Sequence, residues 1–115
     1  MELVALLSSG KGTWGQVAGL IKQEEWDNII LIGNDFARKF TCEKKHEFIE
    51  IKDNNIKEIK SELLEKLKNK IKGTEVALSI ASGTGKEHMA LISTLLSLPV
   101  GVRFIVLTKD GITLM

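Results

Sequence analysis

The sequence predicts an α/β fold of the Rossmann-like, doubly wound kind, with a mainly parallel sheet and a C-terminal β-hairpin. Three observations lead to this prediction. Short apolar runs alternate with segments of helical periodicity along the chain, as strand–helix–strand units require. Glycine-rich loops follow the first and the fourth of these runs, where a strand turns into a helix. Near the end, Asp110-Gly111 separates two apolar runs, which is typical of a hairpin turn.

Strands and helices are expected to alternate until the hairpin. The expected strands are residues 3–7, 28–32, 46–51, 75–81, 102–107 and 112–115. The expected helices are residues 14–23, 36–40, 56–72 and 85–98. Thr13 and Asn55 are predicted N-caps, because a side-chain oxygen there accepts a hydrogen bond from a free amide of the first turn. Gly73 and Pro99 are predicted to end the two longer helices.

Apolar spacing assigns an inner face to the longer elements. Residues 46–51 alternate apolar and polar side chains, which predicts a half-buried strand near an edge of the sheet. In the helix at 56–72 the expected inward residues are Ile56, Ile59, Leu63, Leu67 and Ile71. In the helix at 85–98 they are Met89, Ile92, Leu95 and Leu96. Lysines on the outer face of 56–72 alternate with glutamates, so a solvated face is predicted rather than a nucleic-acid surface.

Composition excludes several classes of protein. A chain of 115 residues, 43% of them hydrophobic, is expected to form one domain, residues 1–115. The formal net charge of +1 gives no overall field for duplex nucleic acid or an anionic membrane, and no apolar stretch can span a bilayer. Cys42 is the only cysteine, which excludes an intramolecular disulfide and cysteine-rich zinc sites and fits a cytoplasmic location. No signal peptide, no metal site and no cofactor are expected.

Two loops carry the candidate chemistry. One spans residues 8–13, Ser-Ser-Gly-Lys-Gly-Thr, and the other spans residues 82–86, Ser-Gly-Thr-Gly-Lys. Small residues let the backbone approach a ligand, hydroxyl and amide groups donate hydrogen bonds, and lysine supplies positive charge, a combination that suits phosphate. In a doubly wound sheet the winding reverses between the first and fourth strands, and ligands bind at their carboxyl ends. The sequence therefore predicts that both loops form one anion site.

Other interpretations of these loops stay open. Neither loop is a P-loop, because the glycine required five residues before Gly-Lys is Ala5 in one loop and Ile80 in the other. A Gly-x-Gly-x-x-Gly pattern does begin at Gly10, and Asp35 is the acid available to contact a ribose in a dinucleotide-binding arrangement. Both loops also fit plain strand-to-helix turns, in which glycine serves the backbone alone.

The segment 78–90, Leu-Ser-Ile-Ala-Ser-Gly-Thr-Gly-Lys-Glu-His-Met-Ala, resembles the second signature of CARF domains, the Rossmann-like sensor domains of CRISPR-associated proteins. That signature follows the fourth strand and reads roughly Thr/Ser-Gly-Gly-Thr-Lys-x-Met, before a helix rich in small residues. Here Lys86 stands three residues before Met89 rather than two. Residues 8–10 match the family's first ligand-contacting loop, and residues 95–110 are similar to the region before its closing hairpin.

The resemblance implies a protein of antiviral defence that binds a cyclic oligoadenylate, expected to be cyclic tetra-adenylate, across the two-fold axis of a homodimer. Some family members are ring nucleases, in which a ribose 2′-hydroxyl attacks the adjacent phosphodiester without a metal and leaves a 2′,3′-cyclic phosphate. Ser9 and Lys86 fall at the catalytic positions, and cleavage and binding alone both remain open. The candidate ligand-binding residues are Ser8, Ser9, Gly10, Lys11, Gly12, Thr13, Asn34, Ser82, Gly83, Thr84, Gly85, Lys86 and His88.

Two other functions stand beside this one. A small Rossmann-like module for a mononucleotide or dinucleotide would bind one ligand per monomer rather than one per dimer. A non-enzymatic partner domain of a larger complex would show an exposed apolar patch away from the crevice. Three candidate residues also have plain interpretations: Trp14 packs rather than stacks on a base, Asn34 caps a helix, and His88 lies at an interface or in solvent.

Overall fold

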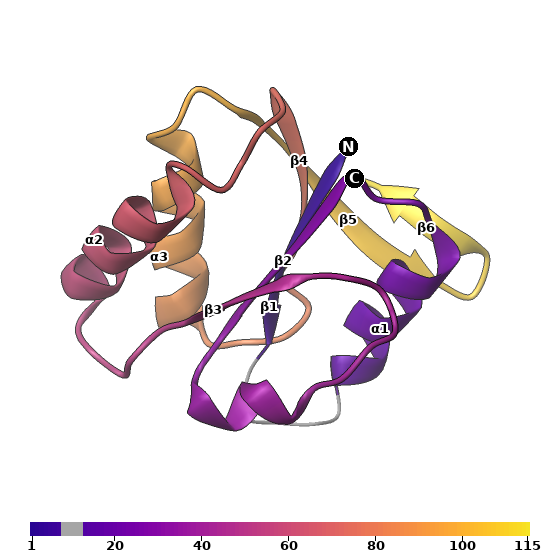
Figure 1. Cartoon of the computed structure of the whole chain (residues 1–115), viewed down its shortest axis with the longest axis horizontal. Coiled ribbons are helices and arrows are strands. Elements are labelled where there is room, and N and C mark those ends of the chain that lie inside the picture. The colour runs from indigo at the N-terminus through magenta and orange to yellow at the C-terminus, as the bar shows by residue number, and fades with distance from the viewer. Residues whose placement is uncertain (8–12) are drawn as a thin grey trace.

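The computed structural model describes residues 1–7 and 13–115, and its centre is a six-stranded sheet in the order β3-β2-β1-β4-β5-β6 (Figure 1). The strands are β1 (Glu2–Leu7), β2 (Asn28–Gly33), β3 (Glu47–Glu50), β4 (Glu75–Ser79), β5 (Gly101–Thr108) and β6 (Gly111–Leu114). The strands from β1 to β5 pair in parallel, and β6 pairs antiparallel with β5. The fold is therefore Rossmann-like α/β with the predicted C-terminal hairpin, and β3 lies at an edge as its alternating pattern predicted.

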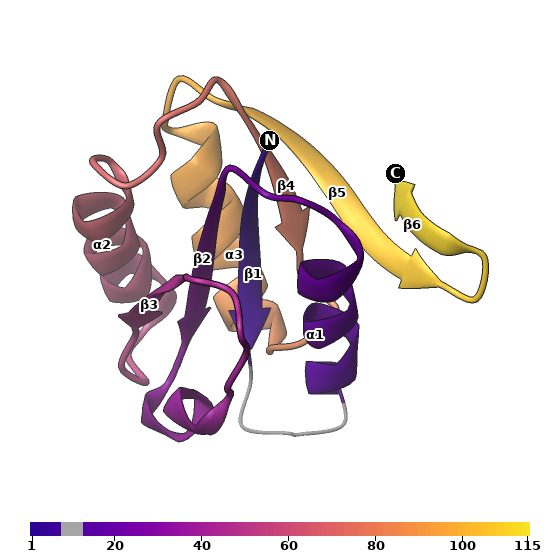
Figure 2. The same cartoon turned by 45° about the vertical axis from the view of Figure 1, so that its right-hand side comes forward.

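Helices cover both faces of this sheet (Figure 2). One face carries α1 (Trp14–Gln23) and the short 3₁₀ helix η2 (Asp35–Lys39), and the other carries α2 (Ile56–Leu67) and α3 (Gly85–Leu96). The β5–β6 hairpin forms the end of the sheet opposite β3 (Figure 2). Among the helices described, none is both long enough and apolar enough to cross a membrane.

The central strand β1 contributes to two separate cores. Val4 and Leu6 point toward α2 and α3, whereas Leu3, Ala5 and Leu7 point toward α1, and all five side chains are fully buried. A parallel strand that is covered on both faces needs apolar residues at every position, which is why this run shows no alternation in the sequence. The carboxyl end of β1 is therefore held from both sides of the sheet.

The helix α2 ends at Leu67, although its apolar pattern predicted an end near residue 72. The reason lies in β1, where the Glu2 carboxylate accepts hydrogen bonds from the backbone amides of Lys72 and Gly73 at 2.9 and 2.5 Å. These bonds draw the chain out of the helix and toward β4. Ile71, which continues the apolar pattern, packs against the core from the connection rather than from the helix.

The strand β4 is also shorter than predicted, because it ends at Ser79 and not at residue 81. Ile80 still packs against the core, but the chain leaves the sheet and turns at Gly83, whose φ is 105°. The helix that follows, α3, ends at Leu96, two residues before the predicted end. The apolar runs thus overestimate the lengths of β4 and α3, because apolar residues in a connection contribute to the same core.

The buried face of α3 differs from the predicted one. Met89 and Leu96, which were predicted to point inward, are 58% and 73% exposed. The residues that α3 buries are Ala90, Leu91, Thr94 and Leu95. Because α3 packs against α2 as well as the sheet, small residues are favoured on the side near α2. There the Thr94 hydroxyl donates to the Ala90 carbonyl oxygen at 2.8 Å and lies 3.4 Å from the Lys60 carbonyl oxygen of α2. Met89 and Leu96 lie outside this buried set and remain on the surface.

Candidate functional site

The strands β1 and β4 are neighbours at the point where the winding of the sheet reverses. They run parallel, with Glu2 opposite Val76 and Ala5 opposite Ser79, so the loops that follow them leave from the same edge. This confirms the topology on which the predicted site depends. The predicted site residues Ser8, Ser9, Gly10, Lys11 and Gly12 lie outside the described residues.

The loop after β4 is shaped by a close approach to β1. Gly83 has a left-handed backbone conformation, and a Cβ atom at this position would collide with the side chain of Leu6. Ser82 beside it is 2% exposed, and its carbonyl oxygen accepts a hydrogen bond from Nε2 of His88 at 2.9 Å. Gly83 is therefore required by the turn itself, and the half-buried His88 holds the loop onto α3.

Side chains of α3 occupy its own N-terminus. The Thr84 hydroxyl accepts a hydrogen bond from the backbone amide of Glu87 at 3.2 Å, and the Glu87 carboxylate accepts one from the Thr84 amide at 2.8 Å. This capping box also places a negative charge where the helix dipole would otherwise attract an anion. Gly85 opens the helix with free space where a Cβ atom would stand. The Glu87 amide is therefore already bonded, and Lys86 is the residue of this loop that supplies positive charge for a phosphate.

The start of α1 is held by side-chain packing rather than by a capping hydrogen bond. Thr13 occupies the N-cap position, but its side chain makes no capping hydrogen bond, so its predicted capping role is wrong. Trp14 instead lies against Phe36 and Phe40, with ring centroids 5.7 and 5.8 Å away, which confirms that this side chain packs. The first turn of α1 contains no acidic residue, so nothing in that turn offsets the positive end of the helix dipole.

Lys86, the predicted catalytic lysine, forms an ion pair across the carboxyl edge. Its Nζ atom lies 2.7 Å from Oδ1 of Asp53, in the connection between β3 and α2. The hydrogen bond from Lys86, together with its positive charge, holds the pKa of the Asp53 carboxyl below its ordinary value. Both side chains are accessible to water, with exposed fractions of 39% for Lys86 and 92% for Asp53.

A pocket of about 360 Å³ lies beside this ion pair, and we call it the carboxyl-edge pocket. Its lining residues are Asn34, Ile51, Lys52, Asp53, Ile59, Thr84, Lys86 and Glu87. They come from the connections that follow β2, β3 and β4, at the starts of α2 and α3. Two lysines face two carboxylates in this lining, so the pocket carries no net formal charge while all four are in place.

Three of the predicted site residues line the carboxyl-edge pocket: Asn34, Thr84 and Lys86. Asn34 caps η2, because its Oδ1 accepts a hydrogen bond from the Ala37 amide at 3.1 Å, which confirms the predicted cap. Asp53 and its neighbour Lys52 were missed by the sequence analysis. A signal for them existed, because they follow the third strand directly and the carboxyl ends of parallel strands share one edge.

Ser79 places a polar group beneath the same edge. Its side chain is 1% exposed, and its hydroxyl has no hydrogen-bond partner in the part of the chain that the structure describes. Ser79 lies two residues after Ala77, which packs in the α1 core, so its side chain points to that face of the sheet. A buried hydroxyl without a partner lowers the stability of the folded state.

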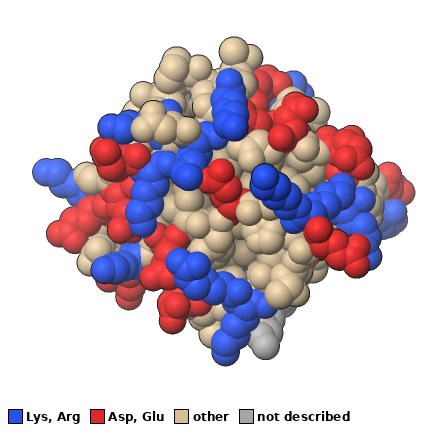
Figure 3. Space-filling model, viewed as in Figure 1, with Lys and Arg blue, Asp and Glu red and all other residues tan. Residues whose placement is uncertain are grey.

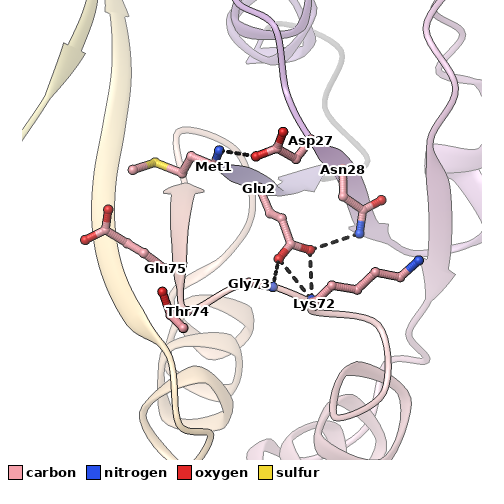
Figure 4. A pocket seen from close by; sticks show the side chains of 8 residues that line it. All are labelled: Met1, Glu2, Asp27, Asn28, Lys72, Gly73, Thr74 and Glu75. Atoms are coloured by element: carbon pink, nitrogen blue, oxygen red, sulfur yellow. Dashed lines mark hydrogen bonds and ion pairs between the residues drawn. The ribbon is translucent and has the colours of Figure 1, made fainter.

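A second hollow, of about 570 Å³, lies at the opposite, amino edge of the sheet (Figure 4). At its centre the Glu2 carboxylate is 3% exposed and accepts hydrogen bonds from Nδ2 of Asn28 at 3.0 Å and from the amides of Lys72 and Gly73. These donors satisfy the buried carboxylate and tie β1 to β2 and to the connection before β4. The polar groups at the centre of this hollow therefore serve the fold, and we assign no ligand to it.

On one face of the molecule, positive and negative side chains are mixed rather than gathered (Figure 3). Lysines, arginines and acidic residues alternate over the face shown in Figure 3. Within residues 1–7 and 13–115, no three His, Cys, Asp or Glu side chains are grouped so that they could hold a metal ion. The chain matches no protein-family model and no curated protein.

Proposed function

We propose that the protein binds a cyclic oligoadenylate, with cyclic tetra-adenylate as the expected ring, at the carboxyl edge of a homodimer. The observation that carries the proposal is the pairing of β1 with β4 where the winding reverses, because it brings two glycine-rich, lysine-bearing loops to one edge. The likeness of residues 78–90 to the second CARF signature supplies the identity of the ligand.

In this proposal the pocket residues share the work of binding. Lys86 pairs with a ligand phosphate, and the side chains of Thr84 and Asn34 face the same pocket with hydrogen-bonding groups. Ser82, Gly83, Gly85 and His88 shape the loop that carries Lys86. The predicted residues of the loop after β1, above all Ser9 and Lys11, complete the phosphate contacts.

Ring opening is the chemical extension of this proposal. The 2′-hydroxyl oxygen of a ribose attacks the adjacent phosphorus, and the bond from that phosphorus to the 5′ oxygen breaks. The 2′-hydroxyl proton is lost and the departing 5′ oxygen gains a proton, which leaves a 2′,3′-cyclic phosphate and a 5′-hydroxyl. Lys86 stabilises the charge that develops on the phosphate, and Ser9 helps to hold the reacting atoms in line. This reaction needs no metal.

Incubation of the pure protein with cyclic tetra-adenylate and cyclic hexa-adenylate, without metal, tests the proposal. A complex with an intact ring identifies a binding protein, and a linear product with a 2′,3′-cyclic phosphate identifies a ring nuclease. Lys86→Ala should weaken binding about tenfold or more, because a direct charge-assisted contact is lost. The matched control is Lys22→Ala, which removes the same charge from the exposed end of α1. Absence of binding at micromolar protein contradicts the proposal, and one ligand per monomer favours the simple nucleotide-binding module.

The proposed homodimer requires a self-complementary surface, and α3 and the hairpin offer an apolar one. Met89 and Leu96 protrude from α3, while Phe104 and Met115 are 38% and 74% exposed on the hairpin side. A hollow of about 450 Å³ is lined by Leu78, Ile80, Ala81, Phe104, Ile105, Val106 and Met115. Of the four exposed side chains, Phe104 and Met115 line this hollow, and we call Met89, Leu96, Phe104 and Met115 together the apolar patch. Its four side chains are large and uncharged, a composition typical of interfaces.

The apolar patch also favours a second function, that of a non-enzymatic domain that docks on a larger protein. The patch belongs to α3 and the hairpin, whereas the carboxyl-edge pocket lies between the starts of α2 and α3. A docking domain needs only the first of these surfaces. The two functions differ in a simple observable, since the homodimer forms in the pure protein and the docking domain remains a monomer until its partner is added.

A further inference from the structure

Asp53 stands where the proposed ligand would place a phosphate. Its carboxylate oxygen lies 2.7 Å from Nζ of Lys86, and both residues line the carboxyl-edge pocket. At this distance the carboxylate takes one of the three ammonium donors and offsets much of its charge. Lys86 therefore cannot offer its full charge to a phosphate while Asp53 keeps this position.

The contact between Asp53 and Lys86 can open without disturbing the fold. The Asp53 side chain is 92% exposed, and its only hydrogen bond in the described part of the chain is the one to Lys86. The connection that carries it is anchored on both sides, by the buried Ile51 and by Asn55, whose side chain caps α2. Exposed ion pairs of this kind add little to stability. Asp53 can therefore turn into solvent when another anion reaches Lys86.

Lys52, the neighbour of Asp53, provides a second positive charge in the same pocket. Its ammonium takes part in no ion pair within residues 1–7 and 13–115, and its backbone amide is held by Oε1 of Glu62 at 3.4 Å. A phosphate that meets Lys52 therefore has no carboxylate to displace. The pocket thus combines one lysine that is already paired with one that is not.

We propose that Asp53 is an internal competitor for the phosphate at Lys86, and that the pocket consequently selects ligands with several phosphates over ligands with one. Exchange of the carboxylate for a single phosphate replaces one anion by another, so it gains less than contact with an unpaired lysine would. A further phosphate on the same ligand meets Lys52 and adds attraction without a second displacement. This inference rests on the proposed function and names the residue pair that sets its ligand selectivity.

The test compares Asp53→Asn with Glu47→Gln in the full chain. Glu47 pairs with Lys70 at 2.9 Å at the start of β3, so this control removes an exposed carboxylate from a similar ion pair at the amino edge. The probes are inorganic phosphate, tripolyphosphate and cyclic tetra-adenylate. Asp53→Asn should bind tripolyphosphate about two- to fivefold more tightly than wild type, and Glu47→Gln should bind it as wild type does. The gain should shrink as salt rises from roughly 20 to 200 mM, because the competing pair is exposed.

A second variant tests the selectivity directly. Lys52→Ala should lower the ratio of tripolyphosphate affinity to phosphate affinity about two- to fivefold, since the unpaired lysine is lost. Equal or weaker tripolyphosphate binding by Asp53→Asn, or no tripolyphosphate binding by any variant, overturns the inference. Asp53→Asn could bind tripolyphosphate more tightly than wild type while no variant binds cyclic tetra-adenylate. That result supports Asp53 as the competitor and overturns the proposed ligand, so the two failures are distinguishable.

Discussion

Gly83, in the loop after β4, lies so close to Leu6 of β1 that a single methyl group would not fit between them. The contact joins the two strands that flank the reversal of the sheet, at the level where the candidate site begins. Because φ at Gly83 is 105°, the backbone conformation and the lack of space both demand glycine. Gly83 thus connects the core of the protein to the loop that carries Lys86.

Gly83→Ala should therefore destabilise the fold by about 2–4 kcal/mol, since it adds left-handed strain to a clash in the core. The matched control is Gly85→Ala two residues later, where a Cβ atom meets open space at the first position of α3. That variant should stay within about 0.5 kcal/mol of wild type. Urea unfolding of both variants measures the difference, and equal midpoints would contradict the close contact.

The buried carboxylate of Glu2 should be required for stability rather than for ligand binding. Glu2→Gln leaves one acceptor oxygen for the amides of Lys72 and Gly73 and turns an NH2 group toward the side-chain amide of Asn28. We expect a loss of about 1.5–3 kcal/mol in the free energy of unfolding. Glu75→Gln, at the rim of the same hollow, is the control and should be nearly neutral. A neutral Glu2→Gln would show that an uncharged amide serves these three donors as well as the carboxylate does.

Gln16 of α1 hydrogen-bonds to the part of β5 that extends beyond the end of β4. β5 continues to Thr108 while its neighbour β4 ends at Ser79, and Gln16 pairs with the backbone of Leu107 through Nε2–O and Oε1–N contacts of 2.7 and 3.0 Å. Gln16→Ala should cost about 1–2 kcal/mol and raise hydrogen exchange at the Leu107 amide. Gln23→Ala, on the exposed last position of α1, should change neither quantity.

The ion pair at the carboxyl edge predicts a defined pH dependence. Lys86 donates a hydrogen bond to Asp53 and holds the pKa of that carboxyl below its ordinary value of 3.8. Because this pKa is lower in the folded state, the pair stabilises the fold above the unfolded pKa, and the contribution is lost as the pH falls through the folded pKa. An NMR titration should place the Asp53 midpoint below 3.8, and Lys86→Gln should return it toward 3.8. Identical midpoints in both proteins would mean that the pair does not form in solution.

Patterns set by local chemistry predicted much of the fold. The apolar run in β1 predicts a strand buried on both faces, and Asp110-Gly111 predicts the hairpin, where Gly111 has a φ of 110°. Contacts between distant residues account for what was not predicted. The end of α2 depends on Glu2, 70 residues before Lys72, and the buried face of α3 depends on its packing against α2. Neither contact leaves a periodic signal in the sequence.

At the candidate site the loop after β4 was predicted, but the contacts of its side chains were not. Thr84 and Lys86 were assigned to a ligand, whereas the structure gives them Glu87 and Asp53 as neighbours. The capping box itself is visible in the sequence as Thr-x-x-Glu. To predict the pairing of Lys86 with Asp53, 33 residues away, one must know the direction of the long, flexible Lys86 side chain, which topology alone does not provide.

The apolar patch should determine whether the protein associates. Leu96→Glu places a charge at a position that is 73% exposed, so it should leave the unfolding free energy of the monomer nearly unchanged while weakening a homodimer at least tenfold. Ile56→Glu, at a 39% exposed position in the first turn of α2, is the matched control and should not affect association. Sedimentation equilibrium measures both variants. If the wild type is still a monomer at a protein concentration on the order of 100 μM, any dimer is weaker than the micromolar dissociation constants typical of specific pairs. The homodimer is then wrong, and docking on another protein is favoured.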